Sequence, residues 1–251
     1  MQFCCLGSGS KGNTTLVRDG DTTLMIDCGF SVRHVEARLA SRIGSPGDIT
    51  AILVTHEHAD HINGVAALAR KWSLPVYASR GTAKTGKLDN VADLRWISPD
   101  RSFRIGSVEI TPVIVPHDAH EPCQFRFDSG PKRLGVMTDL GSVSPYVQQA
   151  FAACDALLLE ANHDLDMLWA GRYPARLKQR VAGDWGHLSN CQAERFVRSL
   201  NLDRLQTLVL GHISEENNHP EIVRRHFAGL ESRVGRVAYA TQDDGFDWIS
   251  I

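Results

Sequence analysis

The chain has 251 residues, a formal net charge of −2 at pH 7 and 43% hydrophobic residues. The length suits one large domain or two small ones, and the total charge does not demand a nucleic acid or a membrane as partner. The start of the chain lacks a basic segment followed by a long apolar run. No apolar stretch reaches the roughly 20 residues that span a bilayer, so we expect no secretory signal and no membrane partner.

The cysteines are scattered and show neither zinc-ribbon nor disulfide spacing. They are Cys4, Cys5, Cys28, Cys123, Cys154 and Cys191. We therefore expect reduced, mostly buried thiols in a cytoplasmic protein rather than a disulfide framework. The chain contains no internal repeat, low-complexity tract or long linker, so we expect a single domain over residues 1–251.

Apolar runs and turn residues predict the elements of the first third of the chain. Runs with strand-like composition occupy 3–6, 14–18, 22–27 and 51–55. Residues 31–42 predict a helix, because Val35 and Leu39 recur on one helical face. After the polar stretch 56–61, apolar residues again recur at helical spacing.

The rest of the chain alternates strands and helices. Strand-like runs occupy 108–116, 123–129, 132–139, 156–160 and 207–212, and helical spacing occupies 189–200 and 220–227. The first of these helices opens with a capping box, since Gln192 follows Ser189 by three residues. The last two runs, 236–241 and 246–250, predict a closing β-hairpin around the turn residues 242–245.

Two β-rich halves, each with helices, predict two packed β-sheets with helices on their outer faces. Several polar residues directly follow apolar runs, namely Asp27, His56, Asp139, Glu160 and His212. Strand ends at one edge of such a sandwich can bring side chains from distant parts of the chain together. We therefore expect one shared site at that edge.

Residues 54–61, VTHEHADH, crowd three histidines and two carboxylates behind a predicted strand. In an extended segment His56 and His58 can bind one ion, while Asp60 and His61 turn towards a second. Imidazole and carboxylate groups suit zinc, manganese or iron, and a pair of ions can clamp an attacked group from both sides. Further ligands would come from His117, Asp139 and His212. The alternatives are a solvated loop and strand-end residues that make only local hydrogen bonds.

The pattern HxHxDH, followed by an isolated histidine, an isolated aspartate and a last histidine, resembles the metallo-β-lactamase superfamily of binuclear hydrolases over essentially the whole chain. The resemblance implies an α/β fold, the αββα four-layer sandwich. It implies one metal site formed by His56, His58 and His117 and a second formed by Asp60, His61 and His212, with Asp139 bridging the ions. Asp60 would be indispensable for catalysis through its metal, and Asp27 would orient the HEHADH loop.

The superfamily hosts thioester, lactone, lactam and phosphodiester hydrolysis as well as redox chemistry. The redox branch has a carboxylate where this chain has His58, and true β-lactamases usually lack a residue like His61. The segment GDWGHLSN (183–190) resembles a motif of the phosphodiesterase branches, including ribonuclease Z, which implies that His187 protonates the leaving oxygen. Glu160 would orient His187 and raise its pKa. The alternatives are a packing or capping role for His187 and a surface position for Glu160.

Substrate contacts are expected around this motif. His163 would add a phosphate or metal-shell contact. The segment 171–183 carries the basic residues Arg172, Arg176, Lys178 and Arg180, which could neutralise phosphates or form only a solvated helix face. Hydrogen bonds to phosphate are expected from Asn13, Ser189, Asn190 and Asn217.

Longer motifs resemble the YycJ family, a cytoplasmic group with the same fold. They are GSGSKGNTTLV (7–17), ANHDxxML (161–168), YPARLKQRV (173–181), GHLSN (186–190) and LGHISEENN (210–218). This resemblance implies a DNA exonuclease that works from the 5′ end, takes part in DNA repair and uses two divalent ions, either zinc or manganese, with iron a third option. The alternatives are a small-molecule phosphodiesterase, an acyl or lactone hydrolase, or a binding or signalling protein without turnover. The oligomeric state stays open.

Overall fold

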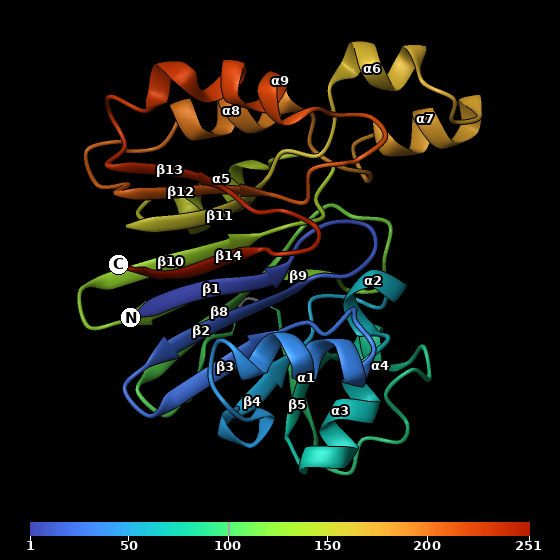
Figure 1. Ribbon diagram of the computed structural model, residues 1–251, viewed down its shortest axis with the longest axis vertical. Coiled ribbons are helices and arrows are strands. Elements are labelled where there is room, and N and C mark those ends of the chain that lie inside the picture. The colour runs from blue at the N-terminus through green and yellow to red at the C-terminus, as the bar shows by residue number, and fades with distance from the viewer. Residues whose placement is uncertain (100) are drawn as a thin grey trace.

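Two β-sheets lie face to face between layers of helices in the computed structural model, which describes residues 1–99 and 101–251 (Figure 1). The described part of the first sheet has seven strands. In spatial order they are β14 (Phe246–Ser250), β1 (Gln2–Gly7), β2 (Thr14–Asp19), β3 (Thr22–Ile26), β4 (Ala51–Leu53), β5 (Val76–Ser79) and β6 (Leu94–Ile97). The pairs from β14 to β3 are antiparallel, and those from β3 to β6 are parallel.

The second sheet also has seven strands among the described residues. In spatial order they are β13 (Arg236–Tyr239), β12 (Thr207–Gly211), β11 (Ala156–Glu160), β10 (Lys132–Met137), β9 (Cys123–Ser129), β8 (Val108–Ile114) and β7 (Phe103–Ile105). Strands β10 to β13 run parallel, and β7 to β10 are antiparallel. Each sheet therefore joins a parallel half to an antiparallel half.

Helices cover the outer face of each sheet (Figure 1). The first sheet packs against α1 (Val32–Ala40) and α3 (Val65–Trp72), and the second against α5 (Pro145–Phe151), α8 (Asn190–Arg198) and α9 (Pro220–Phe227). The other described helices are α2 (Ala59–Ile62), α4 (Arg80–Ala83), α6 (Leu165–Ala170), α7 (Ala175–Val181), η1 (Pro46–Asp48) and η2 (Ala228–Leu230). The expected αββα sandwich is thus confirmed.

Strand β11 shows why continuous apolar runs form the centre of this fold. Leu157 and Leu159 point towards the helices of the second sheet, whereas Leu158 points between the sheets, and all three are buried. Because successive side chains of a strand alternate between faces, a strand covered on both sides needs apolar residues at every position. Burying each leucine stabilises the fold by roughly 1.5–3 kcal/mol.

The expected C-terminal hairpin is wrong. β13 pairs with β12 in the second sheet, whereas β14 pairs with β1 in the first. The turn itself forms, since Thr241 and Gly245 exchange two backbone hydrogen bonds of 3.2 Å. The strands diverge beyond the turn because β12 and β1 each offer an edge for pairing, so the end of the chain crosses from one sheet to the other.

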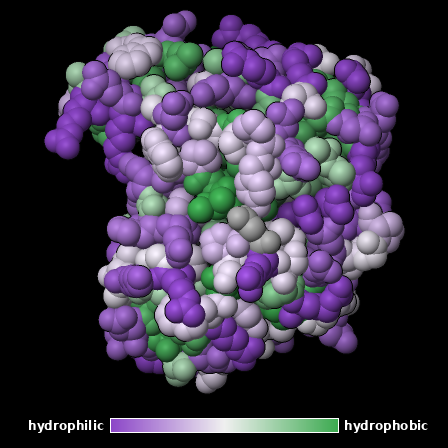
Figure 2. Space-filling model, turned by 180° about the vertical axis from the view of Figure 1, so that it is seen from behind, coloured by the Kyte–Doolittle hydropathy of each residue, from purple (hydrophilic) through white to green (hydrophobic). Residues whose placement is uncertain are grey.

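Helices α6 and α7 form a projection at the upper right of Figure 1, beyond the second sheet. In Figure 2, which shows the molecule from behind, the projection lies at the upper left and is mostly hydrophilic. It carries the basic segment 171–183. None of the helices in residues 1–99 and 101–251 has the length and apolar character needed to cross a bilayer.

Candidate metal centre and active-site cleft

The polar strand ends converge at one edge of the sandwich, as expected. Asp27 follows β3, Asp139 lies two residues after β10, and His212 follows β12. All three have positive φ angles, of 59°, 56° and 50° respectively. This left-handed conformation is unfavourable for residues other than glycine and is typical of functional sites. It turns the chain sharply at each strand end, so that three side chains from three strands reach one place.

Asp27 holds the HEHADH loop in position, which agrees with its expected role. Its Oδ1 accepts a hydrogen bond from the backbone N–H of Thr55 (2.8 Å), and its Oδ2 accepts from the Thr55 hydroxyl (2.7 Å) and from His61 Nδ1 (2.7 Å). The loop also packs against Gly29, where a Cβ atom would lie 1.8 Å from the carbonyl oxygen of Asp60. Only glycine fits at that position without moving the loop.

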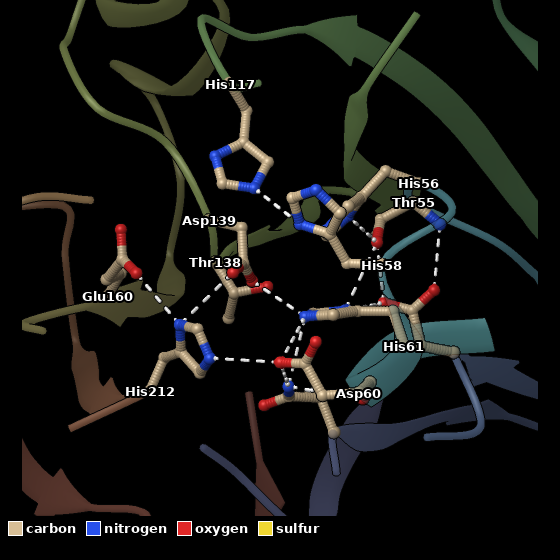
Figure 3. A network of polar contacts seen from close by, with 12 residues as sticks. Thr55, His56, His58, Asp60, His61, His117, Thr138, Asp139, Glu160 and His212 are labelled. Atoms are coloured by element: carbon tan, nitrogen blue, oxygen red, sulfur yellow. Dashed lines mark hydrogen bonds and ion pairs between the residues drawn. The ribbon is translucent and has the colours of Figure 1, made fainter. Parts of the chain in front are cut away.

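The predicted ligands form two adjacent groups (Figure 3). The first contains His56, His58 and His117, and the second contains Asp60, His61, Asp139 and His212. In each group, one candidate ligand atom from every residue lies within 4.8 Å of the others. A third group overlaps the second and contains Asp139, Glu160, His187 and His212.

Hydrogen bonds orient three of the imidazole rings. Nδ1 of His61 donates to Asp27, Nδ1 of His212 donates to Glu160 Oε1 (2.9 Å), and Nδ1 of His117 donates to the carbonyl oxygen of Gly186 (2.9 Å). Burial lowers the pKa of His61 and His212, but Asp139 and the other nearby carboxylates raise both above the usual value, so a bound cation would replace the Nε2 proton of these two rings. Because each Nδ1 acceptor is a carboxylate or carbonyl oxygen, Nδ1 keeps its proton and Nε2 is the nitrogen available to a metal. Such fixed tautomers are typical of metal-binding histidines.

Several polar atoms at this centre fit a cation better than they fit the surrounding protein. Nε2 of His56 is buried and has no hydrogen-bond partner. Nε2 of His61 lies 3.0 Å from Oδ2 of Asp139, and Nε2 of His212 lies 3.6 Å from Oδ2 of Asp60, so these candidate ligand atoms face one another (Figure 3). Buried polar atoms are rarely left unpaired, because their desolvation is costly. A mixed set of imidazoles and carboxylates is a donor set for zinc, manganese or iron. The residues present therefore fit divalent metal ions.

Electrostatics favour the ligand forms of two central residues. Burial lowers the pKa of His56 well below its usual value, so its imidazole is neutral near pH 7. Burial raises the pKa of Asp139, but the charges of His212 and His61 outweigh that effect and hold this pKa well below its usual value. Asp139 is therefore a carboxylate and His56 a free base, the forms that bind cations.

Glu160 is fully buried, so the alternative of a surface position is wrong. Its Oε1 accepts hydrogen bonds from Nδ1 of His187 (2.7 Å) and of His212, and its Oε2 accepts from the backbone N–H groups of Leu140 (3.2 Å) and Leu188 (3.0 Å). Burial raises the pKa of Glu160, but the charge and hydrogen bond of His187 lower it to about 2. The carboxylate is thus ionised and holds His187 in one orientation.

A cleft of about 310 Å³ opens above the second ligand group. Asp60, Asp139, His187 and His212 line its base, while Tyr173 and Arg180 reach it from the α6–α7 projection. Arg180 forms an ion pair with Asp118, whose Oδ1 lies 3.8 Å from Nε2 of His58. The cleft therefore combines the metal centre, a half-buried histidine paired with a buried glutamate, and a cationic side chain.

The basic segment contributes less to the cleft than expected. Arg172 is 85% exposed and pairs with Glu216 (3.1 Å) outside the cleft. Lys178 Nζ donates to the carbonyl oxygen of Trp169 (2.7 Å) and does not line the cleft either, nor does Arg176. Arg180 is the member of this segment's basic cluster that reaches the cleft.

Most of the polar residues expected to bind phosphate have structural partners instead. Ser189 forms the predicted capping box of α8, with Gln192. Asn190 Nδ2 donates to the side chain of Asn218 (3.0 Å). Asn13 Nδ2 donates to Asp60 Oδ2 (3.2 Å) and so supports a ligand. Their buried side chains lie outside the cleft lining, whereas Asn217 belongs to it.

His163 is fully buried, lies outside the cleft lining and has no hydrogen-bond partner on either ring nitrogen. Burial lowers its pKa to about 4, so the ring is neutral. Its expected contact with phosphate or metal stays a prediction. Sequence reasoning also missed Asp118 and Tyr173 as residues beside or in the cleft. Their signals were weak, namely an aspartate next to His117 and a tyrosine within a basic motif.

Comparison with known proteins agrees with this geometry. The profile of the β-lactamase superfamily domain matches residues 22–213. The chain is 37% identical over 256 residues to exodeoxyribonuclease WalJ of Streptococcus pneumoniae serotype 2 (strain D39 / NCTC 7466), which covers 99% of this chain and 92% of the relative. It is 36% identical over 228 residues to exodeoxyribonuclease YycJ of Bacillus anthracis, which covers 89% and 86%.

A solved structure confirms the fold. The metallo-β-lactamase fold protein YhfI from Bacillus subtilis superposes with a TM-score of 0.74 at 19% identity, over 99% of both chains. The family expected from the HxHxDH pattern is thus confirmed by sequence and the architecture by structure. The chain belongs to the β-lactamase superfamily and has the metallo-β-lactamase fold.

Proposed function

We propose that this chain is a metal-dependent phosphodiester hydrolase that acts as an exodeoxyribonuclease. Two relatives that carry this name match it over most of their length. The complete set of candidate ligands supports an active enzyme rather than a binding or signalling relative. The proposal takes the ions to be zinc or manganese, with iron a third option, and assigns them to the two groups of ligands. Asp139, a member of the second group, would be the carboxylate shared with the first, as the sequence resemblance implies.

The bound ions would supply positive charge for the phosphate oxygens and would lower the pKa of water so that it can attack near neutral pH. The protein has to hold these ligands, orient the substrate and handle the proton of the leaving oxygen. The first task falls to the hydrogen bonds that fix His61, His117 and His212.

The observation that carries the proposal is the His187–Glu160 pair at the base of the cleft. Glu160 occupies Nδ1 of His187, so Nε2 is the nitrogen available to a substrate in the cleft. An alkoxide leaving group needs a proton, and a positioned imidazole accelerates such a step about 10²–10⁴-fold. We assign to His187 the protonation of the departing 3′ oxygen.

We assign phosphate binding to Arg180 rather than to Arg172 or Lys178, because Arg180 lines the cleft. A guanidinium group is well suited to two phosphate oxygens at once. Asn217, one of the amide donors expected from the sequence, also lines the cleft.

Three finer features stay predictions. They are 5′ to 3′ polarity, a role in DNA repair and a cytoplasmic location. The last is supported by the cysteines, since all six are free and five of them are buried, a state that a reducing compartment preserves.

A single gel tests the proposal. Manganese-loaded protein is given linear DNA labelled at one 5′ end, both as duplex and as single strand, beside a closed circle of the same sequence. Metal-dependent loss of the linear label with an intact circle is expected, and Asp60→Ala should abolish it. The same DNA labelled at the 3′ end reports polarity. Intact DNA in every lane, with folded and metal-loaded protein, would instead favour a small phosphodiester or an acyl or lactone substrate.

A further inference from the structure

Three exposed hydrophobic side chains converge beside the metal centre. Ile114 is 41%, Tyr146 42% and Trp185 63% exposed, and together they are half of the six large hydrophobic residues exposed in the described part of the chain. They come from the end of β8, from α5 and from the loop before α8. With Pro116 and Pro122 they line one groove of about 590 Å³, which we call the aromatic groove.

The aromatic groove adjoins the metal centre through one residue. His117, a candidate ligand, is one of its lining residues. The carbonyl oxygen of Trp185 accepts a hydrogen bond from the N–H of Asp118 (3.0 Å), and that of Gly186 accepts from Nδ1 of His117. The backbone that orients a metal-binding imidazole therefore also positions the tryptophan, which lies two residues before His187.

Chemistry favours a nucleobase as the occupant of this groove. An exposed tryptophan offers a flat apolar face, and stacking of an unpaired base on such a face contributes substantially to binding of single strands. A base inside a duplex is already paired and stacked, so it is not available. A phosphate held at the metal centre would place the neighbouring base of the same strand within reach of the groove.

We propose that the aromatic groove binds an unpaired nucleobase next to the scissile phosphate, stacked on Trp185. This inference rests on the proposed nuclease function and adds to it the base-pairing state of the DNA that is cut. The strand is unpaired where it is cut, and single-stranded ends are preferred to blunt duplex ends. Trp185 is a positioning residue, which acts on affinity and not on the chemical step.

The test combines a protein variant with the removal of a base. Manganese-loaded wild-type protein and Trp185→Ala are given single-stranded oligonucleotides, either intact or with one abasic residue at each of the terminal positions in turn. With the intact strand, Trp185→Ala should raise KM about 5- to 150-fold and leave kcat unchanged. One abasic position should raise KM of the wild type by a similar factor and cause no further loss in the variant.

Two variants serve as controls. Trp185→Phe keeps an aromatic face and should keep most of the wild-type affinity. Trp96→Ala removes another largely exposed tryptophan (54%), which lines neither the cleft nor the aromatic groove, and the KM of this variant should equal that of the wild type. Metal content, measured for each variant, should equal that of the wild type, because Trp185 orients the His117 loop only through its backbone.

Two outcomes would overturn the inference while the nuclease function stands. One is a wild-type KM for Trp185→Ala on the intact strand. The other is an abasic penalty as large in the variant as in the wild type. A change of oligomeric state in Trp185→Ala without a change in KM would assign the groove to a protein contact. Failure of the wild type to cleave any DNA would instead contradict the proposed function itself.

Discussion

Oε1 of Glu160 lies 2.7 Å from Nδ1 of His187 and accepts a hydrogen bond from it. Glu160 belongs to β11, whereas His187 lies in a loop 27 residues later. The same oxygen accepts from Nδ1 of His212, a candidate metal ligand. One buried carboxylate therefore orients both a group proposed to act on the substrate and a group proposed to hold a metal. A mutation of Glu160 should therefore affect both roles, whereas a mutation of His187 should affect only one.

Replacing His187 with alanine should slow DNA hydrolysis about 10²–10⁴-fold without loss of metal, because a positioned proton donor is removed while both ligand groups remain. Turnover and metal content should be measured on the same preparation. His226→Ala, which removes another half-buried histidine paired with a glutamate, is the matched control. Loss of metal from His187→Ala would show that His187 is a ligand, as the third group of potential ligands allows.

Replacing Glu160 with glutamine should impair both functions. The amide keeps the shape but loses the charge that two Nδ1 groups share, and such outer partners typically change metal affinity about 10–100-fold. A metal titration should therefore show weaker binding, and turnover should fall even at saturating metal. Glu216→Gln changes a half-exposed glutamate paired with Arg172 and should leave both quantities unchanged. Normal metal affinity in Glu160→Gln would argue against its role towards His212.

Replacing Gly29 with alanine should displace the HEHADH loop, because the new Cβ would lie 1.8 Å from the carbonyl oxygen of Asp60. We expect reduced metal content and activity together with a lower melting temperature. Gly229→Ala is the control, since its Cβ would meet only the end of the Arg198 side chain at 3.4 Å. Full metal content in Gly29→Ala would mean that the backbone at this point yields without moving the ligands.

Asp19 should give the fold an acid-sensitive contact between the two sheets. Hydrogen bonds from Ser129 (2.7 Å) and Ser107 (2.8 Å), together with the N-terminal ammonium group (3.1 Å), hold its pKa below the ordinary value of 3.8. A lowered carboxyl pKa stabilises the fold above that ordinary value, and the stabilisation is lost as pH falls through the folded-state pKa.

Asp19→Asn should therefore lower the free energy of unfolding near pH 7 by about 1–2 kcal/mol, the scale of one or two hydrogen bonds. The difference from the wild type should shrink as the pH falls below 3.8. Urea unfolding of both proteins at pH 7 and at a pH below 3.8 measures this difference in free energy. A difference that does not change with pH would mean that the asparagine affects packing and not charge.

Sequence alone could predict which candidate metal ligands meet, because their signal is local. His56, Asp139 and His212 come after buried runs, and strand ends on one edge of a sandwich must meet. Local sequence patterns likewise predicted β9, β11 and α9 with their observed bounds. Short strands such as β5 and β6 were missed, since four residues carry little periodicity.

The residues that line the cleft were harder to predict, because the exposure and hydrogen-bond partners of a side chain depend on the whole fold. Ser189 and Asn190 have phosphate-binding chemistry, yet they are buried and bonded to neighbouring side chains. Arg172 and Arg180 are indistinguishable in a basic segment, and only the placement of α7 turns one of them into the cleft. The predicted C-terminal hairpin was wrong for a similar reason, since a turn motif does not show which strand edges of the two sheets are free for pairing.

The separation of β13 and β14 has a consequence for synthesis on the ribosome. β1 emerges early, but its outer neighbour β14 emerges only after the other described strands, so that an unpaired strand edge stays open while they are made. Such edges invite pairing with other chains. The nascent protein therefore depends on β13 and β14 to cover one edge of each sheet, and a chain stalled before β14 would leave the edge of β1 open to aggregation.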